Sequence, residues 1–223
     1  SVDCEFPEFG YDCNGACISD ADGDGVCDEN EIAGCTDMTA CNYNSAATDE
    51  DGSCEFTSCL NYSLTIESNE STVTTGTTYR FYVEMTNPTD RLSAVFGHDS
   101  LPLTISAPEG VFNSAFNASW SASGLNPVFL PSFPDMAADS YATIGLDGPA
   151  SSSGLDDAAD PSLVQDVAQP LSPFFEVNES TSLEINTVVG AAIYALNTSS
   201  NGLADENMRV LIMQITTAGS LSG

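Results

Sequence analysis

The chain has 223 residues, and its 33 acidic side chains face three arginines and no lysine, so its formal net charge is -30. Repulsion by this charge excludes nucleic acid and anionic membrane surfaces as partners. The longest apolar run, 188–196, is interrupted by Gly190 and is far shorter than the ~20 residues that span a bilayer, so no membrane span is expected.

Cysteines divide the chain into two predicted domains, 1–59 and 60–223. An even number packed densely into a polar segment predicts a disulfide framework, and therefore an extracellular or cell-surface location. A zinc site, the alternative, would need paired Cys-x₂-Cys or Cys/His clusters, which are absent here. No pairing is assigned, because eight cysteines allow on the order of 100 connectivities. The eight are Cys4, Cys13, Cys17, Cys27, Cys35, Cys41, Cys54 and Cys59.

No signal peptide is visible before Ser1, so we expect a processed chain or one section of a longer one.

The stretch 20–31, DADGDGVCDENE, has the residue order of a calcium loop. Carboxylates occupy positions 1, 3, 5, 9 and 12 of a twelve-residue loop, and glycine occupies position 6. Two unit charges 4 Å apart repel by about 4 kcal/mol at an effective dielectric near 20, so the loop should be ordered only around a cation. The alternative is an exposed acidic turn of a disordered linker. The expected Ca²⁺ ligands are the side chains of Asp20, Asp22, Asp24, Asp28 and Glu31 and the carbonyl of Val26.

The residues before this loop depart from an EF-hand. Residues 13–17, CNGAC, cannot form the amphipathic entering helix that an EF-hand requires. Cys27 stands at loop position 8, where an EF-hand has an apolar residue, so a disulfide is expected to replace that packing contact. With these cysteines, 13–35 resembles thrombospondin type 3 repeats and, more distantly, dockerin loops. The resemblance implies an extracellular calcium module.

A single helical turn is expected over 29–33, ended by Gly34, and a second cysteine unit follows over 34–54. This unit resembles a short repeat of secreted, multi-repeat surface proteins of marine bacteria and some algae, which implies a disulfide-tied spacer. Its oxygen-bearing side chains form a second, weaker candidate calcium set, although they do not follow the loop spacing. The alternative is that Asn and Asp merely favour turns here. The set is Asp37, Asn42, Asn44, Asp49 and Asp51.

Residues 60–223 predict an antiparallel β-sandwich of about seven to ten strands, so the whole chain is expected to be mainly β. The period-two alternation of 79–85 directs Phe81 and Val83 toward a core and Arg80 toward solvent. Short segments rich in β-branched and aromatic residues are separated by Asn-Pro, Asp-Gly and Asn-Gly turn signals. These segments are 64–66, 79–85, 101–105, 141–146, 183–188 and 209–215.

Two segments of this domain are unusual. Residues 210–215 are apolar on both faces, which predicts a central strand or one that another chain covers. Residues 148–161 form a long loop of small residues, which is expected to be mobile or to form a contact surface. The domain loosely resembles the β domains that accompany the cysteine repeat in the same marine surface proteins, and the resemblance implies no catalytic motif.

Catalysis has little support in the sequence. The only histidine, His98, precedes Asp99 and Ser100, but neighbours in sequence do not make a triad, and no Gly-x-Ser-x-Gly elbow exists. Trp120, the only tryptophan, is expected to anchor the core, with a carbohydrate platform as the alternative. In a eukaryotic source, five sequons could carry N-glycans, with chance occurrence as the alternative. They begin at Asn61, Asn69, Asn117, Asn178 and Asn197.

Together these features predict a non-enzymatic extracellular structural module of a surface filament or adhesin, made rigid by Ca²⁺ and disulfides. Self-association could use an open sandwich edge, with the terminal strand of one subunit completing the sheet of the next. The alternative function is a glycan-binding module of a secreted adhesin or enzyme.

Overall fold

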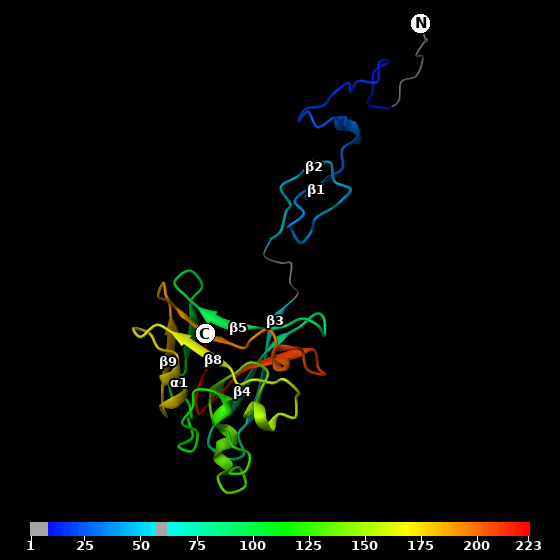
Figure 1. Cartoon of the computed structure of the whole chain (residues 1–223). Coiled ribbons are helices and arrows are strands. Elements are labelled where there is room, and N and C mark those ends of the chain that lie inside the picture. The colour runs from blue at the N-terminus through cyan, green and yellow to red at the C-terminus, as the bar shows by residue number, and fades with distance from the viewer. Residues whose placement is uncertain (1–8, 57–61) are drawn as a thin grey trace. The chain divides into compact units, whose positions relative to one another are not determined.

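A computed structural model describes residues 9–56 and 62–223 of the chain. The chain divides into two compact units, Ser1–Asn61 and Tyr62–Gly223 (Figure 1). The elements are mainly antiparallel β-strands, as the sequence predicts, and two disulfides cross-link the described part of the first unit.

The N-terminal unit has little regular structure. Its elements within residues 9–56 are a 3-10 turn, η1 (Asp28–Asn30), and two short strands, β1 (Ala33–Gly34) and β2 (Asp49–Glu50), which pair in parallel. The expected helical turn over 29–33 is therefore wrong: Glu31 already has extended backbone angles. The Ile32 carbonyl instead accepts hydrogen bonds from the amides of Thr48 and Asp49. These bonds join the end of the loop 20–31 (the acidic loop) to the second cysteine unit.

Disulfides supply the cross-links that a segment without a large core needs. Cys17 pairs with Cys27 and Cys35 with Cys54, and both Cys27 and Cys35 are buried. Cys13 and Cys41 are also disulfide-bonded. The remaining two cysteines of the sequence, Cys4 and Cys59, lie outside the described residues.

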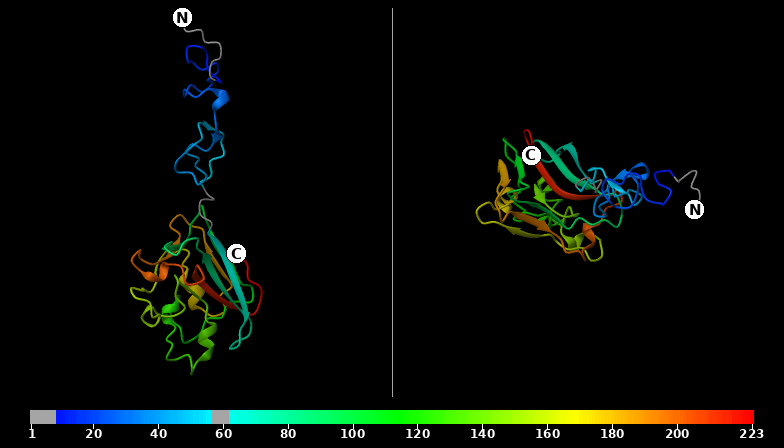
Figure 2. Two further views of the ribbon diagram at one scale, coloured as in Figure 1. Left: turned by 90° about the vertical axis from the view of Figure 1, so that its right-hand side faces the viewer. Right: turned by 90° about the horizontal axis from the view of Figure 1, so that it is seen from above.

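The C-terminal unit contains three antiparallel sheets (Figure 2). One has the strand order β3-β4-β11-β7, the second β5-β10-β8, and β6 pairs with β9 in the third. The first sheet consists of β3 (Ser63–Glu70), β4 (Thr77–Glu84), β11 (Arg209–Thr217) and β7 (Tyr141–Ala142). The others use β5 (Ala94–Gly97), β10 (Ala191–Tyr194), β8 (Ser162–Gln165), β6 (Leu103–Ser106) and β9 (Ser182–Ile185).

Short helical segments occur in the connections of this unit. Among its described residues, the single α-helix is α1 (Ser172–Glu176), which buries the aromatic pair Phe174 and Phe175. The 3-10 turns are η2 (Ala122–Gly124), η3 (Pro134–Ala138), η4 (Ala150–Ser152) and η5 (Ser200–Gly202).

Side chains from all three sheets form the main hydrophobic core. Ile193 of β10, Ile185 of β9 and Ile215 of β11 are each fully buried in it. Fully burying a side chain of this size is worth about 1.5–3 kcal/mol, so this unit does not depend on cross-links for its stability. Sequence patterning missed three of the strands, β5, β8 and β10, because their sequences do not alternate between apolar and polar residues.

A second, smaller core covers the other face of the β4–β11 pair. Tyr82 and Leu211 pack there with Met136 of η3, Leu125 and Tyr141. The expectation that 210–215 forms a central strand is confirmed, since β11 lies between β4 and β7 with buried residues on both faces. The expectation that Arg80 faces solvent is wrong, because the segment bearing η2 and η3 half-buries it.

A β-bulge in β11 changes which residues face each core. The register with β4 shifts between Leu211 and Met213, so Ile212 and Met213 both join the main core. Strict alternation from Val210 would turn Gln214 into that core, but the extra residue places it on the opposite face, paired with Arg80. The bulge thus allows β11 to bury the Gln214 amide without placing it in the main core.

A buried carboxyl group belongs to the same region. Asp139 is fully buried, and its oxygens accept hydrogen bonds from the Ser114 amide and Asn117 Nδ2, both at 2.6 Å. Burial, with a smaller contribution from the like charge of Asp135, raises the pKa of Asp139 to about 7. The folded unit therefore binds a proton near neutral pH that the unfolded chain releases near pH 4.

The free energy of unfolding of this unit should fall as the pH rises from about 4 to about 7, by at most about 1.4 kcal/mol per pH unit, and then level off. Urea titrations followed by Trp120 fluorescence would measure it, since Trp120 packs against the main core. Asp139→Asn should flatten this slope. An unchanged slope in Asp139→Asn would contradict the assignment.

Candidate metal centre

Three carboxylates of the acidic loop converge on one point. Oxygen atoms of Asp20, Asp22 and Asp24 all lie within 4.8 Å of one another, and all three residues are exposed. Ca²⁺ binds oxygens at about 2.3–2.6 Å, so two ligands on opposite sides of one ion are about 5 Å apart. The three groups therefore fit around a single ion, and an all-oxygen donor set is the one that hard divalent cations prefer.

Local hydrogen bonds hold these side chains in place. Asp20 Oδ1 accepts from the Gly23 amide at 2.8 Å, and Asp24 Oδ1 accepts from the Val26 amide at 2.7 Å. Gly25 has φ +94°, a conformation that L side chains rarely adopt, which explains the glycine at loop position 6. Turns at Asp20 and Asp24 therefore direct the alternate carboxylates of the loop toward one point.

Asp28 and Glu31 lie outside this group of three. Asp28 accepts hydrogen bonds from Ser19 Oγ at 2.5 Å and from the Ala21 amide at 2.8 Å, and these contacts lower its pKa. It closes the loop by joining position 9 to the residues around position 1. The pKa of Glu31 is raised, first by partial loss of hydration and then by the nearby charges of Asp49 and Asp22.

The like charges around Glu31 have a consequence for metal binding. A cation seated among them would replace repulsion with attraction, and would draw Glu31 in its ionised form. Asp49 belongs to the second cysteine unit, so that unit adds negative charge to the first site. Sequence spacing assigned Asp49 only to the weaker set, because its approach depends on the pairing of β1 with β2.

The Cys17–Cys27 disulfide supplies the frame that an EF-hand takes from helices. It joins residues ten positions apart, with Cα atoms at 5.2 Å, and Cys27 has no exposed surface. Closing a loop of that length stabilises the folded form by about 3 kcal/mol in the chain-entropy model. The covalent link thus limits how far the acidic side chains can separate when they repel one another.

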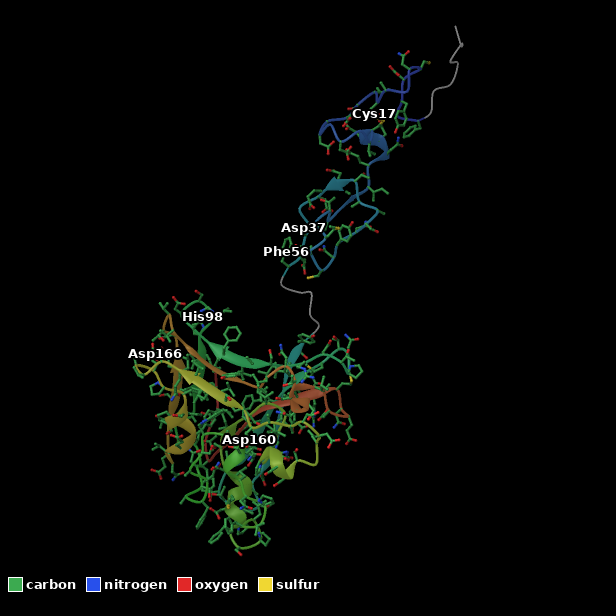
Figure 3. All side chains as sticks on the ribbon, viewed as in Figure 1. Cys17, Asp37, Phe56, His98, Asp160 and Asp166 are labelled. Carbon is green, nitrogen blue, oxygen red and sulfur yellow. A yellow bond between two sulfur atoms is a disulfide. The ribbon has the colours of Figure 1, made fainter. Side chains whose placement is uncertain are left out.

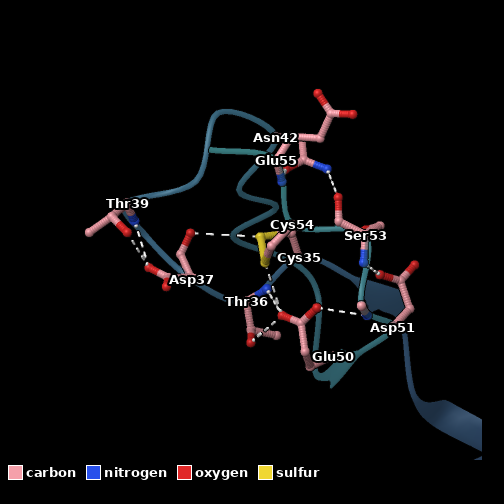
Figure 4. The surroundings of a disulfide bond; sticks show 11 residues. Cys35, Thr36, Asp37, Thr39, Asn42, Glu50, Asp51, Ser53, Cys54 and Glu55 are labelled. Atoms are coloured by element: carbon pink, nitrogen blue, oxygen red, sulfur yellow. Dashed lines mark hydrogen bonds between the residues drawn. A yellow bond between two sulfur atoms is a disulfide. The ribbon is translucent and has the colours of Figure 1, made fainter. Parts of the chain in front are cut away.

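The second candidate set is not gathered in the same way. Among the residues that the structure describes, Asp37, Asp49 and Asp51 belong to no group of three ligand atoms within 4.8 Å. Asp37 accepts from the Thr39 amide and hydroxyl, and Asp51 accepts from the Ser53 amide (Figure 4). These are turn contacts.

The two amides of this set also form hydrogen bonds with the backbone. Asn42 donates to the Ser53 carbonyl and accepts from the Glu55 amide, which joins the middle of its unit to the C-terminal end of that unit. Asn44 accepts from the Ala46 amide. The geometry agrees with the reading that Asn and Asp stabilise turns in this unit.

Glu50 is a residue that the sequence did not single out. It lies with Cys35 and Cys54 in a second group of possible ligand atoms, but those sulfurs are joined in a disulfide and offer no thiolates (Figure 4). Its carboxylate accepts from the Thr36 amide and hydroxyl and from the Gly52 amide, and these bonds lower its pKa. Glu50 therefore supports the fold beside the disulfide.

The sequons differ in accessibility. Asn69, Asn178 and Asn197 are exposed, and Asn61 lies outside the described residues. Asn117 is 3% exposed, and its Nδ2 donates to Asp139 and to the Ser121 carbonyl. An N-linked glycan would occupy that same nitrogen, so the folded arrangement is incompatible with glycosylation of Asn117.

The remaining candidate residues of the C-terminal unit, His98 and Trp120, contact residues of their own unit. Figure 3 labels His98 in the C-terminal unit. Its Nδ1 lies 3.2 Å from Asp99 Oδ1, and the Ser100 hydroxyl donates to Asp99 rather than to the imidazole. This is a turn after β5, in which no hydroxyl is activated by a base. Trp120 is partly buried against the main core, which agrees with an anchoring role.

Comparison with protein family models, with curated proteins and with solved structures found no match. In the described part of the chain, no helix has both the length and the apolar composition needed to cross a membrane.

Asp22→Asn should weaken Ca²⁺ binding by roughly tenfold or more, because affinity depends on the number of charged ligands. Calorimetric titration of the whole chain would measure the change. Asp37→Asn is the matched control, since it removes one exposed carboxylate from the second cysteine unit, and it should leave the affinity unchanged. Equal losses in both variants would contradict a site centred on 20–24.

Calcium affinity should also rise as the pH rises through the pKa of Glu31, which lies above its ordinary value of 4.5. The metal binds the ionised carboxylate, so protons and Ca²⁺ compete for it. Titrations at about pH 4.5, 5.5 and 6.5 would show the increase, and Glu31→Gln should reduce it. A pH dependence that is identical in Glu31→Gln would exclude Glu31 as a ligand.

Proposed function

We propose that this protein is an extracellular structural module of a surface filament or adhesin, whose N-terminal unit becomes rigid when it binds Ca²⁺. The observation that carries the proposal is the convergence of Asp20, Asp22 and Asp24 in a loop tied by the Cys17–Cys27 disulfide. The resemblance of 13–35 to thrombospondin type 3 repeats supports calcium as the metal.

The mechanism is mechanical. The N-terminal unit has little buried apolar surface, and its carboxylates repel one another at neutral pH. A bound cation removes this repulsion and stabilises the folded loop by mass action. Because the Ile32 carbonyl joins the loop to Thr48 and Asp49, order in the loop would extend to the second cysteine unit. The acidic N-terminal unit would thereby become a rigid spacer.

Self-association would use the open edge of the sandwich at β3. Leu64 and Ile66 alternate along this edge strand and line an apolar groove of about 380 Å³ with Phe81 and Leu103, yet they are 57% and 51% exposed. Inward-facing residues that remain this exposed indicate room for a further strand. No Asp, Glu or Arg lines the groove, so two strongly acidic copies could approach there without bringing carboxylates together.

The terminal strand itself is an unsuitable donor. β11 pairs with β4 and β7 of its own unit and is buried throughout, so donating it would dismantle both cores. The groove would therefore receive another extended segment of a second copy. Glycan binding, the alternative function, gains no support from Trp120, because this side chain packs against the core.

Chelation of Ca²⁺ should loosen the N-terminal unit and disperse assemblies. A glutamate-specific protease should then cleave within 20–31 roughly tenfold faster or more, since access to the chain follows local unfolding. Mass spectrometry of the fragments and negative-stain micrographs would record both effects, with cleavage in the β unit as the internal control. Unchanged cleavage and unchanged assemblies after chelation would contradict the proposal.

Ile66→Asp should abolish assembly, because it places a charge in the apolar groove at a cost of several kcal/mol once the groove is covered. Val167→Asp is the control, since Val167 is 94% exposed and does not line the groove. Light scattering would measure assembly, and circular dichroism would confirm folding. Loss of assembly in both variants, or in neither, would exclude the groove as the contact.

A further inference from the structure

A second cavity lies on the outer face of the β4–β11–β7 sheet. It has a volume of about 270 Å³, and its walls combine apolar side chains with the guanidinium-bearing Arg80 and the phenol of Tyr141. The apolar part includes Leu125, Leu130 and Met136. The loop 148–161 contributes Gly148, Pro149, Ser152 and Ser153 to one wall, which gives that stretch of small residues a structural role.

Arg80 is held in this cavity by a buried amide. Its Nε donates to Gln214 Oε1 at 2.8 Å. Gln214 is 1% exposed, and its amide nitrogen Nε2 donates to the carbonyls of Ala137 and Asp139. The guanidinium is thus oriented by Gln214, whose own amide donates to two carbonyls, and the Tyr82 side chain is a further partner.

In the described part of the chain no carboxylate contacts Arg80, although the charge of Asp147, which lines the same cavity, attracts its guanidinium from a longer range. Among the described residues, no acidic side chain lies within 4.0 Å of its nitrogens, although the chain contains 33 acidic residues. Arg209, by contrast, pairs with Glu67 at 2.6 Å. An arginine that no carboxylate contacts retains donors for a planar anion.

Tyr141 provides a second donor. The residue is 1% exposed, and its hydroxyl lies 3.5 Å from Gln214 Oε1, which already accepts from Arg80. That separation is at the limit for a hydrogen bond between oxygens, whose usual distance is about 2.7–2.8 Å. The hydroxyl therefore makes only a long hydrogen bond, and a ligand that offers a closer acceptor would gain binding free energy.

We propose that this cavity binds a small organic carboxylate with an apolar body. A guanidinium and a carboxylate form paired hydrogen bonds of matching geometry, and the Tyr141 hydroxyl would donate to the same group. The apolar side chains would cover the body of the ligand. A cation would be repelled by Arg80, and a neutral apolar molecule would leave the guanidinium desolvated without a partner.

Asp147 provides a test of whether the bound ligand is negatively charged. This exposed residue lines the same cavity, and its charge opposes an incoming carboxylate. The net charge of -30 also repels anions, but salt screens that field beyond about 8 Å at physiological ionic strength. Binding should therefore not weaken between about 20 and 200 mM salt, unlike binding that depends on long-range attraction.

Benzoate is the probe, and benzyl alcohol is its neutral counterpart of similar shape. Chemical-shift titration of the whole chain should show saturable shifts around the cavity for benzoate, and binding of benzyl alcohol at least about tenfold weaker. Arg80→Gln should weaken benzoate binding by a similar factor. Asp147→Asn should strengthen it roughly two- to fivefold, because one like charge is removed.

Asp156→Asn is the matched control, since it removes an exposed acidic charge from the same loop at a residue that does not line the cavity, and it should leave the affinity unchanged. If Arg80→Gln fails to fold, Asp147→Asn still tests the proposal. Equal binding of benzoate and benzyl alcohol, no saturable binding of benzoate, or equal effects of Asp147→Asn and Asp156→Asn would overturn it.

Discussion

Repulsion among carboxylates is the constraint on which the rest of this structure depends. With three arginines against 33 acidic residues, almost no carboxylate can be neutralised by a basic side chain. Most of those in the N-terminal unit accept hydrogen bonds from backbone amides or hydroxyls instead, as Asp12, Asp28 and Glu50 do. Such bonds stabilise the charged form, but they do not remove the repulsion between neighbouring groups.

The two units meet this constraint in different ways. The N-terminal unit combines covalent cross-links with a cluster of carboxylates that suits a divalent cation, because it buries too little apolar surface to fold by that means alone. The C-terminal unit places its acidic residues mainly at the surface and builds two cores around one strand. Its buried exception, Asp139, takes up a proton near neutral pH.

Strand β11 connects the features of the C-terminal unit. It separates the main core from the smaller one, and its bulge turns Gln214 toward Arg80. The same face carries the covering segment with η2 and η3, which closes the second core and forms part of the Arg80 cavity. At the other side of the sheet, β3 is left as an open edge with its apolar residues half-covered. The same central strand thus contributes Ile212 and Met213 to the groove beside β3 and Gln214 to the contact with Arg80.

The sequence by itself determined the mainly β class, the disulfide-rich character of the first 59 residues and the convergence of Asp20, Asp22 and Asp24. Each of these depends on short-range spacing: alternate residues of a turning loop face one point, and period-two alternation produces strands. The apolar composition of 210–215 likewise predicted a strand that is covered on both faces, and the pairing with β4 and β7 showed that its own unit covers it.

Only the tertiary structure decided which polar residues are buried and which charges meet. Arg80 alternates with core residues along β4 and so reads as exposed, but a segment about fifty residues away in sequence covers it. Asn117 matches a sequon and is nevertheless buried against Asp139, and Asp49 approaches Glu31 only through the pairing of β1 with β2. These contacts join residues far apart in the chain, and local spacing carries no information about them.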